Sequence, residues 1–185
     1  MTLHLNRKSF TVQEYHQLAE IGILKESDRV ELLYGDIVTI SPTKSAHAGM
    51  VDSMIELLII KLYKKANIKC QNPISLDKLS EPEPDIAVVK YKADGYSSQH
   101  PGPEDIYLVI EVADSSLEKD RQVKGPLYAK AGIPEYWIIN LSDRQIEIHR
   151  EPKDGAYCFQ QTVSEGGRVE SSSVPLSLIY ADIFK

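Results

Sequence analysis

The chain contains Tyr107-Leu108-Val109-Ile110-Glu111-Val112-Ala113 and, upstream of it, Pro84-Asp85-Ile86-Ala87-Val88-Val89. Both segments are short apolar runs rich in β-branched residues, a pattern typical of buried central strands. Each run nevertheless carries one carboxylate, Asp85 or Glu111. An ionised carboxylate is almost never buried unless another charge or a metal ion compensates it. Two acids on neighbouring buried strands therefore predict a cation between them.

Length and composition are those of an ordinary globular protein. The 185 residues suit one domain with one core, so we expect a single domain over residues 1–185. Hydrophobic residues make up 42% of the chain and charged residues 26%, which argues against long disordered segments. The net charge of −6 argues against general electrostatic adhesion to nucleic acid, but not against an acidic site that binds divalent cations.

No segment of the sequence has the pattern of an export signal or of a membrane span. The longest apolar run, Ile55 to Leu62, contains two charged residues and is too short to cross a bilayer. The first residues, with His4, Asn6 and Arg7, lack the apolar core of a signal peptide. We therefore expect a cytoplasmic protein without a membrane partner.

The residues before the Asp85 strand predict a helix, a hairpin, a second helix and a strand. Thr11 and Glu14 have capping-box spacing, and Gly22 can end the helix that they begin. Residues 29–40 form two short β-prone runs around Tyr34-Gly35-Asp36, with Glu31 in the first run. A helix from about residue 44 to residue 66 and a strand over residues 67–76 complete this half.

The end of the second expected helix is the one basic cluster of the chain, with Lys61, Lys64, Lys65 and then Lys69. Lysines in the last turn interact favourably with the helix dipole. The sequence therefore favours a solvated helix end over a phosphate-binding patch.

After the Glu111 strand, the sequence predicts a crossover helix from Ser115 or Ser116 to about Ala131, with a kink at Gly125-Pro126. Asp120, Lys124 and Tyr128 recur every four residues and share one helix face. The following strand, residues 133–140, should lie parallel to the Glu111 strand. The remaining pattern predicts an antiparallel meander over residues 145–150, 157–163 and 168–172, and a short helix within residues 176–184.

These segments carry a resemblance to a known family. The Pro-Asp strand, the Glu-Val-Ala strand, Asp120-x-x-x-Lys124-x-x-x-Tyr128 and Gly132-Ile133-Pro134-Glu135-Tyr136-Trp137 resemble the PD-(D/E)XK nuclease superfamily. More closely, they are similar to the bacterial endonuclease family Uma-two, and the match includes residues 30–37, His47 and residues 180–184. The resemblance implies an α/β, restriction-endonuclease-like mixed central sheet flanked by helices, with an N-terminal hairpin and a C-terminal antiparallel meander.

The resemblance also implies the site and its chemistry. Asp85 and Glu111 would hold Mg²⁺ or Mn²⁺, and Glu31 would join them from the hairpin. The superfamily places a lysine two positions after Glu111, where this chain has Ala113. In this family the amine is expected from the following helix, which points to Lys124. The function implied is a Mg²⁺-dependent nuclease that acts on DNA rather than RNA. Nucleases that cut duplexes commonly pair two active sites, so we expect a homodimer.

Each site residue also has a structural alternative. Glu111 could be the buried partner of Arg121 or Lys124, and Glu31 could face solvent. Lys124 could pair with Asp120, and His47 could be a surface or capping residue. Tyr136 and Trp137 are most simply core residues. Two other functions stay open: a catalytically inactive nucleic-acid-binding or protein-interaction module, and a phosphoesterase for a small substrate.

Overall fold

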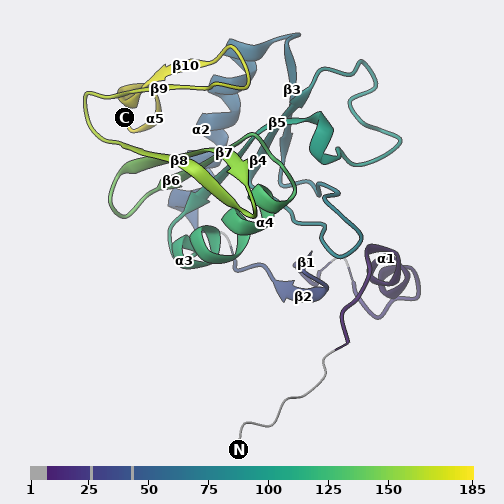
Figure 1. The fold of residues 1–185 in the computed structure, drawn as a ribbon. Helices are drawn as coiled ribbons and strands as arrows, with labels where there is room; N and C mark the ends of the chain where they lie inside the picture. The colour runs from purple at the N-terminus through teal and green to yellow at the C-terminus, as the bar shows by residue number, and fades with distance from the viewer. Residues whose placement is uncertain (1–7, 26, 43) are drawn as a thin grey trace, which may run out of the picture.

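A six-stranded sheet forms the centre of the computed structural model, which describes residues 8–25, 27–42 and 44–185 (Figure 1). The strand order is β3-β4-β5-β6-β7-β8. The strands span Ala66–Cys70, Ile86–Lys90, Ile106–Ala113, Glu135–Asn140, Gln145–Lys153 and Ala156–Val163, from β3 to β8. β5 lies inside the sheet, antiparallel to β4 and parallel to β6. The expected mixed α/β sheet, with the Glu111 strand at its centre, is confirmed.

Each face of the sheet has its own apolar cluster, because successive side chains of a strand point to opposite faces. Leu108, Ile110 and Val112 of β5 pack in the cluster of α2 (Ser45–Leu62). Val109 and Ala113 pack on the opposite face in the cluster of α4 (Gly125–Lys130). Glu111 follows the alternation of Val109 and Ala113. The strand therefore directs its carboxylate toward the helices between β5 and β6.

The N-terminal segment matches its sequence signals. α1 (Val12–Glu20) begins with a capping box, in which the Glu14 N–H donates to Thr11 Oγ1 at 3.1 Å and the Thr11 N–H donates to Glu14 Oε2 at 2.9 Å. β1 (Val30–Leu33) and β2 (Asp36–Thr39) form an antiparallel hairpin. Tyr34 and Gly35 have φ values of 54° and 84°, as in the turns that match the twist of short hairpins.

The crossover between β5 and β6 is a helix in three parts. α3 (Leu117–Lys119) leads into a π-helical turn (Asp120–Lys124), and α4 completes the crossover. The Gly125 N–H donates to the Asp120 carbonyl, five residues back, and Pro126 has no N–H to continue a regular ladder. The kink expected at Gly125-Pro126 is thus a wide turn. Asp120 and Lys124, at the two ends of this turn, and Tyr128, in α4, are all buried.

Two of the expected boundaries in the first half are wrong. α2 ends at Leu62 rather than near Ala66, because Lys64 has a positive φ of 57° and Ala66 already pairs with Lys90 in the sheet. β3 ends at Cys70 rather than at residue 76, because Gln71 has a φ of 47° and leaves the ladder. A short 3₁₀ helix (Pro103–Asp105) follows the loop after β4.

The C-terminal segment also differs in part from its expectation. β7 and β8 form the expected antiparallel pair, but β9 (Arg168–Glu170) leaves the central sheet and pairs with β10 (Ser177–Ile179). The expected helix is reduced to α5 (Tyr180–Ile183). Val169, Leu178 and Ile183 belong to the apolar cluster on the α2 face, where Figure 1 shows β9, β10 and α5 beside α2. β9 and β10 thus add to this apolar cluster instead of extending the central sheet.

Within the described ranges, no helix is long and apolar enough to cross a membrane. Residues 1–7, which contain His4, Asn6 and Arg7, lie outside the residues that the structure describes. The expectation of a cytoplasmic location stays a prediction.

Gly35 and Gly22 provide a matched test of the hairpin turn. Both have positive φ, 84° and 76°, so an alanine costs about 1 kcal/mol at either position. At Gly35 an added Cβ would also lie 2.5 Å from the Cβ of Ser9, whereas at Gly22 it would meet nothing within 4 Å. We expect Gly35→Ala to lower the free energy of unfolding by about 1–3 kcal/mol more than Gly22→Ala in urea denaturation. Equal losses in the two variants would contradict this packing.

Candidate active site

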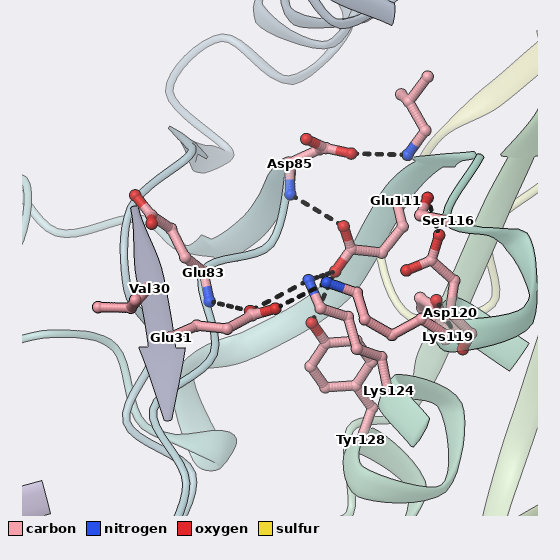
Figure 2. A network of polar contacts seen from close by, with 12 residues as sticks. Val30, Glu31, Glu83, Asp85, Glu111, Ser116, Lys119, Asp120, Lys124 and Tyr128 are labelled. Carbon is pink, nitrogen blue, oxygen red and sulfur yellow. Dashed lines mark hydrogen bonds and ion pairs between the residues drawn. The ribbon is translucent and has the colours of Figure 1, made fainter. Parts of the chain in front are cut away.

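The four residues expected to form the site lie together in the structure. Glu31 comes from β1, Asp85 directly precedes β4, Glu111 lies in β5 and Lys124 closes the π-helical turn. Figure 2 shows Lys124 between Glu31 and Glu111, with the backbone nitrogen of Asp85 directed toward Glu111. The hairpin, the sheet and the crossover helix each supply part of this cluster.

Glu111 is buried, with 3% of its surface exposed, and three donors contact its carboxylate. Oε1 accepts hydrogen bonds from Lys124 Nζ at 2.9 Å and from the Tyr128 hydroxyl at 2.8 Å. Oε2 accepts from the backbone N–H of Asp85 at 3.3 Å. Lys124 is therefore the partner of Glu111, while Arg121 pairs with Glu147 at 2.6 Å.

Glu31 is also buried and does not face solvent. Its Oε2 accepts from the Glu83 N–H at 3.1 Å and lies 3.2 Å from Lys124 Nζ. Its Oε1 accepts from Lys119 Nζ at 3.1 Å. The ammonium group of Lys124 thus joins the carboxylate of the hairpin to the carboxylate of the central strand.

Asp85 differs from the two glutamates because it keeps an open oxygen. Its Oδ2 accepts from the Val112 N–H at 2.8 Å and contacts His47 Nε2 at 3.0 Å. Within the described residues, Oδ1 accepts no hydrogen bond. A cleft opens here, and its lining includes His47, Gln71, Asp85 and Lys119. His47, near the start of α2, is thus a partner of Asp85 rather than a free surface residue.

Sequence reasoning missed three members of the cluster or gave them no role. Tyr128 had been placed only on the face of Lys124, and nothing in the local pattern pointed to Lys119 or to the backbone N–H of Glu83. Asp120 is buried, and its Oδ2 accepts from the Ser116 hydroxyl at 2.6 Å rather than from Lys124. Tyr136 and Trp137, fully buried in the two apolar clusters, are the core residues that the sequence suggested.

The pKa values of the two central groups, Glu111 and Lys124, are both raised, so each group tends to retain a proton. Burial raises the pKa of Glu111 to about 8, and Lys124 opposes this shift. Burial also opposes the charge of Lys124, but the carboxylates of Glu111, Glu31 and Asp120 outweigh it and raise the pKa of Lys124. A neutral Glu111 would contribute less to the raised pKa of Lys124. We assign the charge to Lys124 at neutral pH, because Glu31 lies 3.2 Å away, and the retained proton to Glu111.

The other two acids are held in the ionised form. Burial disfavours the charge of Glu31, yet the ammonium groups of Lys124 and Lys119 outweigh it and lower its pKa. Burial likewise disfavours the charge of Asp85, but hydrogen bonds from His47 and the Val112 N–H lower its pKa. Glu31 and Asp85 thus carry negative charge in the cluster, whereas burial, reinforced by the charges of Asp85 and Asp120, keeps the pKa of Glu111 raised.

The position of Lys124 follows from the pleat of β5. Ala113, two residues after Glu111, lies on the same face of the sheet and is buried in the α4 cluster. A lysine side chain at position 113 would extend from the face of the sheet that the crossover helix covers. Lys124 reaches the same carboxylate from above that face, so its amine stands beside Glu111 although the expected strand position holds alanine.

The residues fit a hard divalent cation such as Mg²⁺. Within residues 8–25, 27–42 and 44–185, no group of three or more His, Cys, Asp or Glu side chains is arranged to hold a metal ion. Mg²⁺, however, is usually held by one or two carboxylates and keeps several waters. The open Oδ1 of Asp85 and the carboxyl group of Glu111, which both line the cleft, offer oxygen donors of that kind.

Comparison with known proteins identifies relatives of both sequence and fold. A family model described as "Uma2: Putative restriction endonuclease" matches residues 12–181. A crystal structure described as a "putative nuclease belonging to DUF820" from Anabaena variabilis ATCC 29413 shares the fold, with a TM-score of 0.73 and 15% sequence identity. The similarity covers 95% of this chain and 97% of that chain. No curated protein matches the sequence.

The raised pKa of Glu111 predicts a specific pH dependence of stability. A carboxyl whose pKa rises from 4.5 to about 8 on folding stabilises the protein at low pH, and this contribution is lost as pH rises through that window. Without added metal, we expect the wild type to lose about 1 kcal/mol per pH unit relative to Glu111→Gln over this range in urea denaturation. Parallel pH profiles for the two proteins would contradict the shift. The same substitution at the exposed Glu118 is the control.

Proposed function

Because the chain belongs to the Uma2 family, we propose that it is a metal-dependent nuclease that hydrolyses phosphodiester bonds in DNA. Glu31, Asp85, Glu111 and Lys124 form its active site in this proposal. The observation that carries it is the ammonium group of Lys124, held 2.9 Å from Glu111 and 3.2 Å from Glu31 beside the cleft that Asp85 lines.

Asp85 and Glu111 would hold the divalent cation, Mg²⁺ or Mn²⁺, which restriction-endonuclease-like proteins generally require. When bound, the ion supplies Lewis-acid stabilisation of the charge that develops on the phosphoryl oxygens. Asp85 is suited to this role because His47 and the Val112 N–H fix one of its oxygens and leave the other directed at the cleft. Glu111 would exchange its retained proton for the charge of the cation.

Lys124 acts as a fixed cation in this proposal and not as a general base. Its pKa is raised by the surrounding carboxylates, so the amine stays protonated near neutral pH. A preorganised ammonium group stabilises negative charge on a phosphate without reorganisation. Glu31 and the Tyr128 hydroxyl hold the amine and Glu111 in place. Lys119, which is 30% exposed, extends the positive charge toward the cleft.

The homodimer expected from the sequence stays part of the proposal. β8 is an edge strand of the central sheet, and most of its residues are exposed. An edge strand offers free backbone groups for a symmetric contact. The alternative function, an inactive binding module on the same fold, is favoured only by Ala113 at the expected lysine position, and the next experiment separates the two.

We expect Lys124→Ala to lower cleavage of a mixed nucleic-acid panel by at least about 100-fold in Mg²⁺ or Mn²⁺, because it removes a charge that acts on the phosphate. Lys153→Ala is the control, since it removes an exposed ammonium group that lies outside the cluster. Adding Ala113→Lys to Lys124→Ala should restore part of the activity, because position 113 lies on the same sheet face. Circular dichroism verifies that each variant folds.

A folded Lys124→Ala protein that cleaves at the wild-type rate would rule out this role for the amine. A wild type that cleaves no substrate with either metal would favour the inactive module.

Metal binding itself predicts a change in thermal stability. A cation held by Asp85 and Glu111 binds only the folded state, so saturating Mg²⁺ or Mn²⁺ should raise the melting temperature by about 5 °C. Asp85→Asn with Glu111→Gln should abolish the increase in differential scanning fluorimetry. Asp154→Asn with Glu165→Gln changes two exposed acids and is the control. An unchanged melting temperature for the wild type would exclude the site.

A further inference from the structure

We propose that a second surface, remote from the active site, binds the single-stranded flank of the nucleic-acid substrate. This inference rests on the proposed nuclease function and extends it. The surface, here called the basic–tyrosine patch, consists of Lys61, Tyr63, Lys64, Lys65, Lys90 and Tyr91.

The pairing of β3 with β4 assembles the patch from two distant segments. The two strands are antiparallel, and Ala66 at the start of β3 pairs with Lys90 at the end of β4. Residues 63–65 and residues 90–91 therefore meet at one end of this strand pair. In Figure 1 that end of β3 lies at the top of the view, away from β1, β2 and α3.

The side chains of the patch are exposed and their charges are available. Tyr63 is 70% exposed and Tyr91 50% exposed. Lys92 pairs with Asp105 at 3.1 Å, but within the described residues no carboxylate pairs with the four lysines of the patch. In a chain with a net charge of −6, this local excess of positive charge is suited to an anionic partner.

A solvated helix end does not explain the whole patch. The helix dipole favours Lys61 in the last turn of α2, but Lys90 and Tyr91 belong to a different element. Lys64 has a φ of 57°, a conformation in which glycine is more stable than lysine. The lysine is thus placed where backbone stability alone would favour another residue.

The two tyrosines favour a single strand over a duplex. Exposed aromatic rings give unpaired bases a surface for stacking, and nearby lysines bind the phosphates between them. Lys64 Nζ lies 5.5 Å from the centre of the Tyr63 ring, so a cation and an aromatic face are presented together. A duplex hides its base faces and could use only the lysines.

β3 connects the patch to the active site. It starts beside the patch, carries Lys69 along its length, and is followed by Gln71, which lines the active-site cleft. The Gln71 N–H donates to the Asp85 carbonyl at 3.0 Å. From Asp85 to Lys90 the strand advances about 17 Å, which at most about five nucleotides span, because an unstacked single strand is longer per nucleotide than the roughly 3.4 Å of a duplex. A flank of that length can reach the patch from the scissile phosphate.

The test is fluorescence anisotropy with labelled oligothymidylates of about 4 and about 12 nucleotides in EDTA, so that no cleavage occurs. The wild type should bind the longer strand more tightly. Lys64→Gln with Lys65→Gln should lower the slope of log affinity against log salt by about 1.4. Tyr63→Ala with Tyr91→Ala should weaken binding about tenfold or more. Lys78→Gln with Lys153→Gln, which removes two exposed lysines elsewhere, should change little.

Lys64→Gly separates binding from folding, because it should weaken binding while the melting temperature stays the same or rises. Patch variants that bind like the wild type would overturn the inference, even if the protein cleaves DNA. Tighter patch-dependent binding to a duplex of equal length, or to phosphatidylserine vesicles, would overturn it as well. Patch-dependent binding by a protein that never cleaves would overturn only the proposed function.

Discussion

The structure depends on how it accommodates one buried acid, the carboxyl group of Glu111 inside the central strand. Burial of an isolated carboxylate costs several kcal/mol, and the cost is offset only when other groups satisfy its oxygens. Here Lys124, Tyr128 and the Asp85 N–H do so. The crossover helix must therefore pack on one face of β5 with Lys124 above Glu111. The wide π-helical turn is part of that geometry.

The compensation is incomplete, so burial leaves Glu111 with a raised pKa and a proton that a cation can replace. Lys124 serves both Glu111 and Glu31, while Asp85 and Asp120 add further negative charge nearby. A protein selected for stability alone would be better served by apolar residues at these positions. Acids with raised pKa values in a cleft are instead typical of functional sites.

Much of the fold could be predicted because its signals are local. The capping box at Thr11, the turn at Tyr34-Gly35 and the β-branched runs around Asp85 and Glu111 each lie within a few residues of the structure that they specify. The pairing of β9 with β10 could not be predicted in this way, because its apolar residues pack against α2, more than a hundred positions earlier in the chain. Glu31 was undecided for a similar reason, since a four-residue strand has too little period to show which face is buried.

The resemblance to a known family implied the mixed sheet. By itself, the sequence determined the two acidic central strands and the helix face shared by Asp120, Lys124 and Tyr128. These features follow from periodicity and from the rarity of carboxylates in apolar runs. Only the tertiary structure decided which amine meets Glu111, that Glu31 and Lys119 join it, and that Lys64 and Tyr91 share one surface. Those contacts depend on strand pairing and helix packing between distant segments, where a displacement of one residue would direct the side chains to other partners.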